Sequence, residues 1–192
     1  MEQVKRLICF GDSITAREIF ENKALRLTPR LQNAFPEWEI LNAGISGNNT
    51  YDALKRLEED VLSYQPSFVI VFFGANDAAF HKQIPLQEYR ENIIEIVERI
   101  SPYKVLLISP APVDEERQYA RTNAVLKQYA EVVSDVAART GSNSLDLYTS
   151  IIQLPNYKLL LENEKQDGLH FGVHGYEYLA EVIIEKIKEI KW

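Results

Sequence analysis

The chain has 192 residues, of which 46% are hydrophobic and 26% charged, a balance typical of a folded globular protein rather than a disordered segment. The formal net charge is −7, and Lys and Arg are scattered along predicted helices, so we expect no nucleic-acid partner. No apolar stretch approaches the roughly 20 residues that span a bilayer, and the apolar run near the start lacks a small-residue cleavage site. We therefore expect one domain over residues 1–192, without a membrane span and located in the cytoplasm.

Five short apolar runs, rich in aliphatic and aromatic residues, are predicted to be β-strands. They are Arg6–Phe10, Trp38–Leu41, Phe68–Phe73, Lys104–Ser109 and Ser144–Leu147. Apolar residues three and four positions apart predict helices over Tyr51–Tyr64, Leu86–Ile100, Glu115–Thr140 and Gly175–Lys191. Thr28 followed by Pro29 predicts the start of another helix, and Gly141 predicts a helix end. The single cysteine, Cys9, lies within the first apolar run and is predicted to be buried.

The alternation of strands and helices predicts a three-layer α/β/α fold with a five-stranded parallel sheet. Continuous apolar runs such as Phe68–Phe73 suit strands that are covered on both faces. The carboxyl ends of parallel strands meet at one edge of the sheet, where ligands bind. Four loops are expected at that edge, with the sequences GDSIT, NAGISGNNTYD, FGANDAAF and SPAPVDEE.

The Gly-Asp-Ser that follows the first predicted strand has two interpretations. It can be an ordinary turn, or it can present Ser13 as a nucleophile. A nucleophilic serine needs an imidazole base, a carboxylate that orients the imidazole, and fixed donors for the tetrahedral oxyanion. Asp167 and His170, three residues apart, fit the base and its carboxylate. The N–H groups of Ser13 and Gly47 and the side-chain amide of Asn76 fit the oxyanion hole.

The segments FGDSIT, NAGISGNN, GANDAA and DGLHF resemble, in this order, the sequence blocks of the SGNH (GDSL) hydrolases, a family of esterases and lipases with a flavodoxin-like sheet. The resemblance covers almost the whole chain. It implies that Ser13, His170 and Asp167 form the catalytic triad. It also implies that Gly47 and Asn76 complete the oxyanion hole with the N–H of Ser13.

A second segment, LISPAPVDEE with the helix after it, resembles the small esterase branch that includes isoamyl acetate-hydrolysing esterases. Two positions depart from the family pattern. Ala111 interrupts the usual run of prolines, and Ala75 stands where the family often has a second glycine. Neither departure removes a residue that the proposed chemistry needs.

The resemblance implies a serine esterase that acts on a small-molecule ester, with short acyl or acetyl esters as the default and without a cofactor or metal. A carbohydrate O-acetylesterase, a thioesterase or a lysophospholipase would use the same triad. Two alternatives come from other classes of protein: a catalytically silent binding module of this fold, and a phosphate-binding protein that uses the GDS loop as an anion cradle. The phosphate-binding alternative lacks support, because the sequence has neither the Walker lysine nor a cluster of metal-binding carboxylates.

Other polar residues of these loops have simpler interpretations. Asp12 is expected to hydrogen-bond the backbone near the bend, and Asp77 to cap the segment that follows it. His81 is expected at the surface. His170 and His174 have the spacing of a helical metal pair, but a glycine lies between them and no Cys or Glu cluster completes a ligand set. His174 is therefore expected at the start of the last helix.

Overall fold

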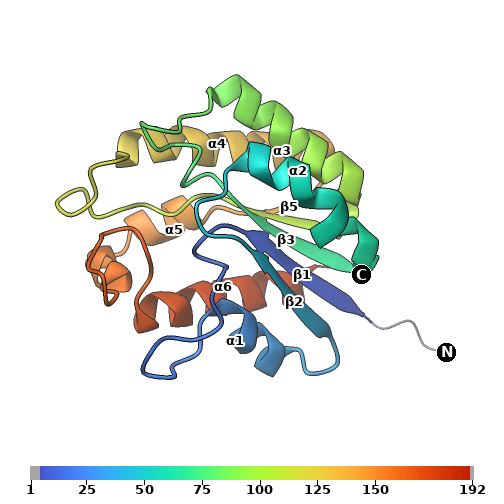
Figure 1. Cartoon of the computed structure of the whole chain (residues 1–192), viewed down its shortest axis with the longest axis horizontal. Helices are drawn as coiled ribbons and strands as arrows, with labels where there is room; N and C mark the ends of the chain where they lie inside the picture. Colours follow the sequence, from blue (N-terminus) through green and yellow to red (C-terminus); the bar gives the residue numbers. More distant parts are fainter. Residues whose placement is uncertain (1–4, 191–192) are drawn as a thin grey trace.

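The computed structural model describes residues 5–190, and its strands form one parallel sheet (Figure 1). Every neighbouring pair of strands in this sheet is parallel. Across the sheet the strands are β2 (Glu39–Gly44), β1 (Arg6–Gly11), β3 (Phe68–Phe72), β4 (Val105–Ile108) and β5 (Asn143–Leu145). The order 2-1-3-4-5 is that of flavodoxin-like folds, whose ligands bind where the strand order reverses, between β1 and β3. The predicted five-stranded parallel sheet is thereby confirmed.

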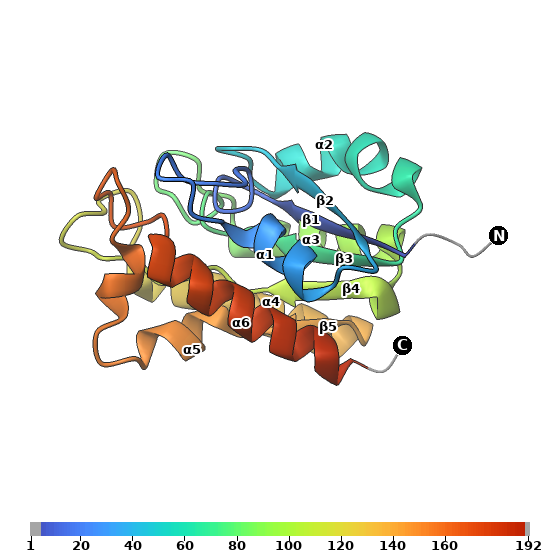
Figure 2. The same ribbon diagram turned by 90° about the horizontal axis from the view of Figure 1, so that it is seen from below.

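Helices cover both faces of the sheet, which confirms the three layers (Figures 1 and 2). One face carries α2 (Thr50–Asp60), α3 (Leu86–Ile100) and α4 (Asn123–Thr140); the other carries α1 (Leu27–Ala34), α5 (Leu147–Ile152) and α6 (Val173–Glu189). Side chains of a strand alternate between faces. In β1, Ile8 and Phe10 pack in the hydrophobic core under α2, α3 and α4, whereas Leu7 and Cys9 pack in the core on the other face, under α1, α5 and α6. The prediction that Cys9 is buried is also confirmed.

The helix predicted from Glu115 begins eight residues later than expected. Residues 115–122 belong to a loop, and the hydroxyl of Thr122 caps α4 by accepting the N–H of Val125 at 3.3 Å. The loop is held by long-range backbone bonds, such as the one from the N–H of Phe80 to the carbonyl of Ala120 at 2.8 Å. Helical spacing in the sequence does not reveal such contacts, so the predicted helix was too long.

The fifth strand also ends earlier than predicted, at Leu145. The Asp146 side chain accepts the N–H of Thr149 at 3.0 Å and caps α5, a helix that the sequence pattern did not indicate. A short 3-10 helix over Tyr157–Leu161 follows α5 and was likewise not predicted.

The helix predicted over Tyr51–Tyr64 is α2, which ends four residues earlier, at Asp60, and is followed by a 3-10 helix over Leu62–Tyr64. The other boundaries lie within three residues of their predictions. α3 has the predicted bounds, and Gly141 ends α4 with φ +74°, as expected of a C-cap. α1 starts at Leu27, so Thr28 is not its N-cap, which is Arg26. The predicted end of the last helix at Lys191 lies outside the described residues. None of the helices within residues 5–190 combines the length and apolar character needed to cross a membrane.

Candidate active site

Ser13 lies in the turn that directly follows β1, at the carboxyl edge of the sheet. The carbonyl oxygen of Asp12 accepts the N–H of Ala16 at 3.0 Å, and its carboxylate accepts the N–H of Ile14 at 2.9 Å. The predicted role of Asp12 near the bend is confirmed. Gly11 has no room for a side chain, because a Cβ there would lie 3.0 Å from a backbone carbonyl of β3. The turn therefore rests closely on the sheet.

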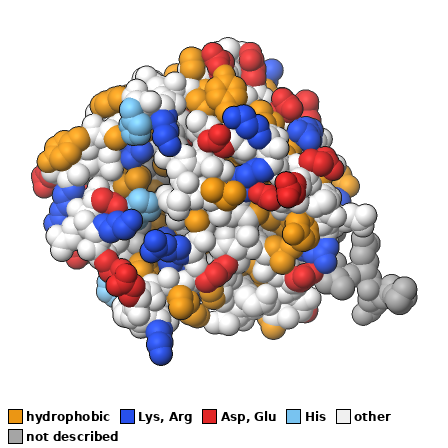
Figure 3. Space-filling view, in the orientation of Figure 1, with side chains coloured by type: hydrophobic (Ala, Val, Ile, Leu, Met, Phe, Trp, Pro, Cys, Tyr) orange, Lys and Arg blue, Asp and Glu red, His pale blue; other side chains and the backbone are white. Residues whose placement is uncertain are grey.

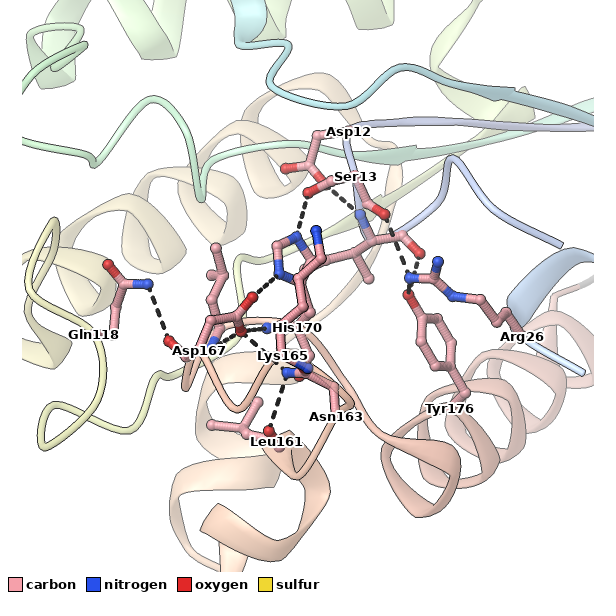
Figure 4. A network of polar contacts seen from close by, with 12 residues as sticks. Asp12, Ser13, Arg26, Gln118, Leu161, Asn163, Lys165, Asp167, His170 and Tyr176 are labelled. Atoms are coloured by element: carbon pink, nitrogen blue, oxygen red, sulfur yellow. Dashed lines mark hydrogen bonds and ion pairs between the residues drawn. The ribbon is translucent and has the colours of Figure 1, made fainter. Parts of the chain in front are cut away.

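The structure brings together the three residues predicted to form a triad. The Oγ of Ser13 lies 2.8 Å from Nε2 of His170, and Nδ1 of His170 lies 2.6 Å from Oδ2 of Asp167 (Figure 4). Ser13 is 157 positions from His170 in the sequence, so only the fold can make this contact. A continuous hydrogen-bonded series thus runs from the serine hydroxyl to the carboxylate.

The second carboxylate oxygen of Asp167 is also saturated with donors. Oδ1 accepts the backbone N–H groups of Leu169 and His170, each at 3.0 Å, and the side-chain amide of Asn163 at 3.0 Å. Partial burial raises the pKa of Asp167, but the hydrogen bonds, led by that from the His170 ring, outweigh it and hold the pKa well below its usual value. Asp167 is therefore an anion in hydrogen-bond contact with the imidazole.

Asn163 is a residue of this site that sequence reasoning missed. Its amide donates to Oδ1 of Asp167 and to the carbonyl oxygen of His170, the latter at 2.7 Å. Its own side-chain oxygen accepts the N–H of Lys165 at 2.7 Å. Asn163 thereby closes the loop that carries the histidine, a role that no motif spacing indicates.

The two remaining oxyanion candidates lie in the loops that follow β2 and β3. Gly47, in the loop after β2, has φ +81°, a conformation that favours glycine. The side-chain Nδ2 of Asn76 donates to the carbonyl oxygen of Asn48 at 2.9 Å and lies 3.4 Å from Oδ2 of Asp12. Asn76 therefore touches both the loop of Gly47 and the turn of Ser13.

Arg56 joins these loops and was also missed from the sequence. Its guanidinium donates to the carbonyl oxygens of Gly11 at 2.9 Å and Ala43 at 2.8 Å, and to the side-chain oxygen of Asn48 at 2.7 Å. An ion pair with Asp60 at 2.8 Å completes its partners. Arg56 thus fixes the ends of β1 and β2 relative to the loop between β2 and α2.

Asp77 lies in a turn, as expected, but its side chain binds the start of α2 instead of the segment that follows it, so the predicted cap was wrong. Its buried carboxylate accepts the N–H of Thr50 at 2.9 Å and the hydroxyl of Thr50 at 2.6 Å, which joins it to the first residue of α2. Burial raises the pKa of Asp77 to about 6, although these hydrogen bonds lower it. Burial likewise raises the pKa of Asp12 to about 6, against the hydrogen bond from Ile14. The loops that follow β1 and β3 thus hold two buried carboxyl groups with raised pKa values.

The other histidines lie outside the hydrogen-bonded series. His174 is the second residue of α6, as predicted, and pairs with Glu177 at 3.0 Å in an exposed position. His81 is exposed, as predicted. Across residues 5–190, no three or more His, Cys, Asp or Glu side chains are grouped so that they could hold a metal ion.

A small cavity of about 80 Å³ opens beside Ser13 and His170. Its walls come from the loop after β1, the loop after β2 and the segment before α6. Besides Ser13 and His170, they include Arg17, Phe20, Arg26, Ser46, Lys165 and Phe171. The volume is well below the 300–1,000 Å³ usual for sites of drug-sized ligands, so a small group fits it best.

Serine, histidine and carboxylate in a hydrogen-bonded series form an arrangement that enzymes of several unrelated folds use for acyl transfer. Residues 9–178 match the model of the GDSL-like lipase/acylhydrolase family. The chain belongs to this family and is a carboxylic ester hydrolase. The predicted resemblance to the SGNH (GDSL) hydrolases is thereby confirmed.

Relatives and solved structures support the same assignment. The human isoamyl acetate-hydrolyzing esterase 1 homolog is 34% identical over 199 residues, which cover 91% of this chain and 77% of that protein. The lipase/acylhydrolase from Enterococcus faecalis is 33% identical and superposes with a TM-score of 0.88, covering 98% of this chain and 100% of that chain. An acetylxylan esterase from Geobacillus stearothermophilus is 25% identical, with a TM-score of 0.75 over 95% of this chain and 94% of that chain.

Proposed function

We propose that the protein is a single domain that hydrolyses short acyl esters through Ser13, His170 and Asp167. The reaction passes through an acyl-enzyme intermediate on Ser13. The hydrogen-bonded series from the Ser13 hydroxyl to the Asp167 carboxylate is the observation that carries this proposal. A hydroxyl 2.8 Å from Nε2 is within reach for direct proton transfer to the ring.

In the first half of the reaction, Ser13 Oγ attacks the carbonyl carbon of the ester while its proton passes to Nε2 of His170. Asp167 accepts the Nδ1–H of the same ring and stabilises the imidazolium that forms. The carbonyl π electrons move onto the oxygen, which becomes the oxyanion of a tetrahedral intermediate. The ester then expels its alcohol, which takes the proton from Nε2, and the acyl group stays on Ser13.

Three donors serve the oxyanion in this proposal: the N–H groups of Ser13 and Gly47 and the amide of Asn76. One Asn76 hydrogen is used by the carbonyl of Asn48 at 2.9 Å. The contact with Asp12 is longer, at 3.4 Å, beyond the usual range of an N–H···O bond. The hydrogen on that side is therefore the one left free to donate to the oxyanion.

In the second half, a water molecule gives its proton to Nε2 and attacks the acyl carbon, and the same proton then returns to Ser13 as the acid leaves. The cavity of about 80 Å³ beside Ser13 favours small groups at this stage. The relationship to proteins named isoamyl acetate-hydrolyzing esterase homologs also favours an acetyl-sized acyl group.

Hydrolysis of acetyl groups from carbohydrate is the second candidate. It is favoured by the structural likeness, at 25% identity, to an acetylxylan esterase that covers nearly the whole chain. The same triad would serve, and only the alcohol side of the ester would differ. Acetylated sugars therefore belong in the substrate panel.

Two measurements test the proposed function. A fluorophosphonate probe should label wild-type protein at Ser13, identified by peptide mass, and should not label Ser13→Ala. A panel of p-nitrophenyl esters of increasing chain length, run beside acetylated oligosaccharides, should show the highest kcat/KM among the shortest acyl groups. Absence of labelling together with absence of hydrolysis across the panel would leave the catalytically silent binding module as the better account.

A further inference from the structure

Arg26 is a buried cation beside the nucleophile that has no carboxylate partner within the described part of the chain. It is only 6% exposed, and Nη2 donates to the hydroxyl of Tyr176 and lies 3.5 Å from the carbonyl oxygen of Ser13 (Figure 4). The guanidinium faces the rings of Phe20 at 5.4 Å and Tyr176 at 4.6 Å. Its Nε is buried and has no hydrogen-bond partner.

Arg56, on the opposite side of the Ser13 turn, is a partly buried arginine whose hydrogen-bond and ion-pair partners are all supplied by the protein. Each of its three side-chain nitrogens has an oxygen partner, and Asp60 balances its charge. A buried guanidinium without a counter-ion is unfavourable, and ring contacts offset only part of that cost. Arg26 therefore has spare capacity for an anion, which Arg56 does not have.

The cavity supplies a place for such an anion. Arg26 lines it together with Ser13, and so do Arg17 and Lys165, two exposed cations that form no ion pair with the described residues. Glu164 is the one carboxylate in the lining. Figure 3 shows Lys and Arg side chains beside the histidines at the left of the view, with Asp and Glu side chains among them. In the cavity lining itself three cations face one carboxylate, although the whole chain carries a net charge of −7.

We propose that the preferred substrates are esters that also carry a carboxylate, and that Arg26 binds this carboxylate inside the cavity. This inference rests on the proposed ester hydrolysis at Ser13. The planar guanidinium matches a carboxylate in shape and in hydrogen-bond geometry. Arg17 and Lys165 attract the anion to the cavity. Because Nη2 of Arg26 lies 3.5 Å from the Ser13 carbonyl oxygen, the substrate carboxylate lies only a few atoms from its ester carbonyl.

Matched ester pairs test the proposal with the wild-type protein. On the alcohol side, 4-acetoxybenzoate is compared with its neutral isostere 4-acetoxybenzamide; on the acyl side, monophenyl adipate is compared with phenyl adipamate. We expect kcat/KM to favour the anion by about 10- to 100-fold in one of the pairs, the range of one charge-assisted hydrogen bond. The preference should shrink in 0.5 M NaCl as the exposed cations are screened. A ratio near one or below in both pairs overturns the proposal.

Variants assign the preference to Arg26. Arg26→Met keeps much of the apolar bulk and should bring the ratio of kcat/KM values for the preferred pair close to one. Arg30→Met is the matched control, because Arg30 lies in α1, pairs with Glu177 and does not line the cavity, so the ratio should stay at its wild-type value. The ratio cancels any general loss of activity that either variant suffers. A wild-type ratio in Arg26→Met contradicts the assignment.

Two further measurements keep the proposal open to refutation if Arg26→Met does not fold. The exposed double variant Arg17→Gln with Lys165→Gln should lower the ratio about threefold at low salt, and an unchanged ratio counts against the proposal. Calorimetric titration of Ser13→Ala with the preferred ester pair measures binding without turnover; the anionic ester should bind about tenfold more tightly than its amide, and equal affinities contradict the proposal. Wild-type protein that hydrolyses none of the four esters contradicts the proposed function, whereas equal hydrolysis within both pairs contradicts only the carboxylate preference.

Discussion

The two walls of the site are held in place by different means. The nucleophile wall, residues 12–16, continues directly from β1 and is tied to the sheet through Arg56 and through the close contact at Gly11. The base wall, residues 163–171, lies between a 3-10 helix and α6 and is not part of the sheet. It is held by Asn163 and by the loop after β4, whose Asp114 N–H donates to the carbonyl of Gly168 at 2.8 Å.

Because the two walls are held differently, substitutions in them should have different kinds of effect. Strands buried on both faces open only with the whole fold, whereas loops held by a few side-chain bonds can open locally. Substitutions in the nucleophile wall should therefore remove a chemical step while the fold stays intact. Substitutions in the base wall should change how often the imidazole is correctly placed.

The largest effect is expected from Ser13→Ala, which removes the proposed nucleophile. Ester hydrolysis should fall by about 10⁵- to 10⁶-fold in kcat, as for other serine hydrolases that lose this group. The melting temperature should change little, because the lost hydroxyl forms one hydrogen bond, to His170, within the described residues. The measurement is hydrolysis of a soluble acetate ester, with thermal unfolding followed in parallel. Ser134→Ala, an exposed serine on α4, is the control, and activity of Ser13→Ala within tenfold of wild type contradicts the mechanism.

The next largest effect is expected from Asp167→Asn in the base wall. The asparagine leaves Ser13 and the oxyanion donors in place, so kcat should fall by up to about 10⁴-fold, less than for Ser13→Ala. Steady-state hydrolysis of one soluble acetate ester by wild type, Asp167→Asn and Ser13→Ala checks this order of effects.

The low pKa of Asp167 also predicts how this variant unfolds in acid. A carboxyl whose pKa is depressed by folding stabilises the protein above its unfolded value and loses that contribution as the pH falls below about 4. Wild-type protein should therefore lose more free energy of unfolding between pH 6 and pH 3 than Asp167→Asn does. If neither kcat nor the acid stability changed in the variant, a different group would orient His170.

A smaller effect is expected from Asn76→Ala in the oxyanion hole. Loss of one oxyanion donor typically lowers kcat by about 10²- to 10³-fold. KM should change little, because the charge that the Asn76 amide stabilises develops only in the transition state. Steady-state kinetics with one acetate ester separate the two constants. A change confined to KM would reassign Asn76 to substrate binding.

The sequence allowed the nucleophile wall to be predicted almost completely. A continuous apolar run predicts a strand that is buried on both faces, and a Gly-Asp-Ser directly after it predicts the turn at its carboxyl end. The alternation of such strands with helices then predicts the sheet. Spacing and family resemblance together paired Asp167 with His170, which lie on one turn. These features depend on residues close together in the chain, or on the regular geometry of a parallel sheet.

What could not be predicted depends on contacts between irregular loops. Arg26 and Arg56 act through partners far away in the sequence, such as Tyr176 and Gly11. Residues 115–122 have helical spacing, but their backbone is held by other loops instead of forming the start of α4. A periodic pattern carries no information about such pairings. The single-domain boundary and the cytoplasmic location stay predictions of the sequence.

The smallest of these effects is expected from Asn163→Ala, which tests the base wall without substituting a residue of the proposed triad. The variant loses the hydrogen bonds to Asp167 and to the carbonyl of His170. Asp167 keeps its backbone donors, so the pair still forms, but the loop that carries it opens more often. A loss of about 1–2 kcal/mol of local stability corresponds to a fall of about 5- to 30-fold in kcat/KM.

Asn143→Ala provides the matched control for this prediction. Asn143 also donates its amide to a backbone carbonyl, that of Val105 at 3.3 Å, but it lies in β5 and away from the cavity. Both variants should lose similar stability in thermal unfolding, and only Asn163→Ala should lose activity. Hydrogen exchange should also show faster exchange of the Leu169 and His170 amides in Asn163→Ala alone, because their acceptor carboxylate is less well held. Equal activity losses in the two variants would mean that general destabilisation, and not the placement of the imidazole, limits the rate.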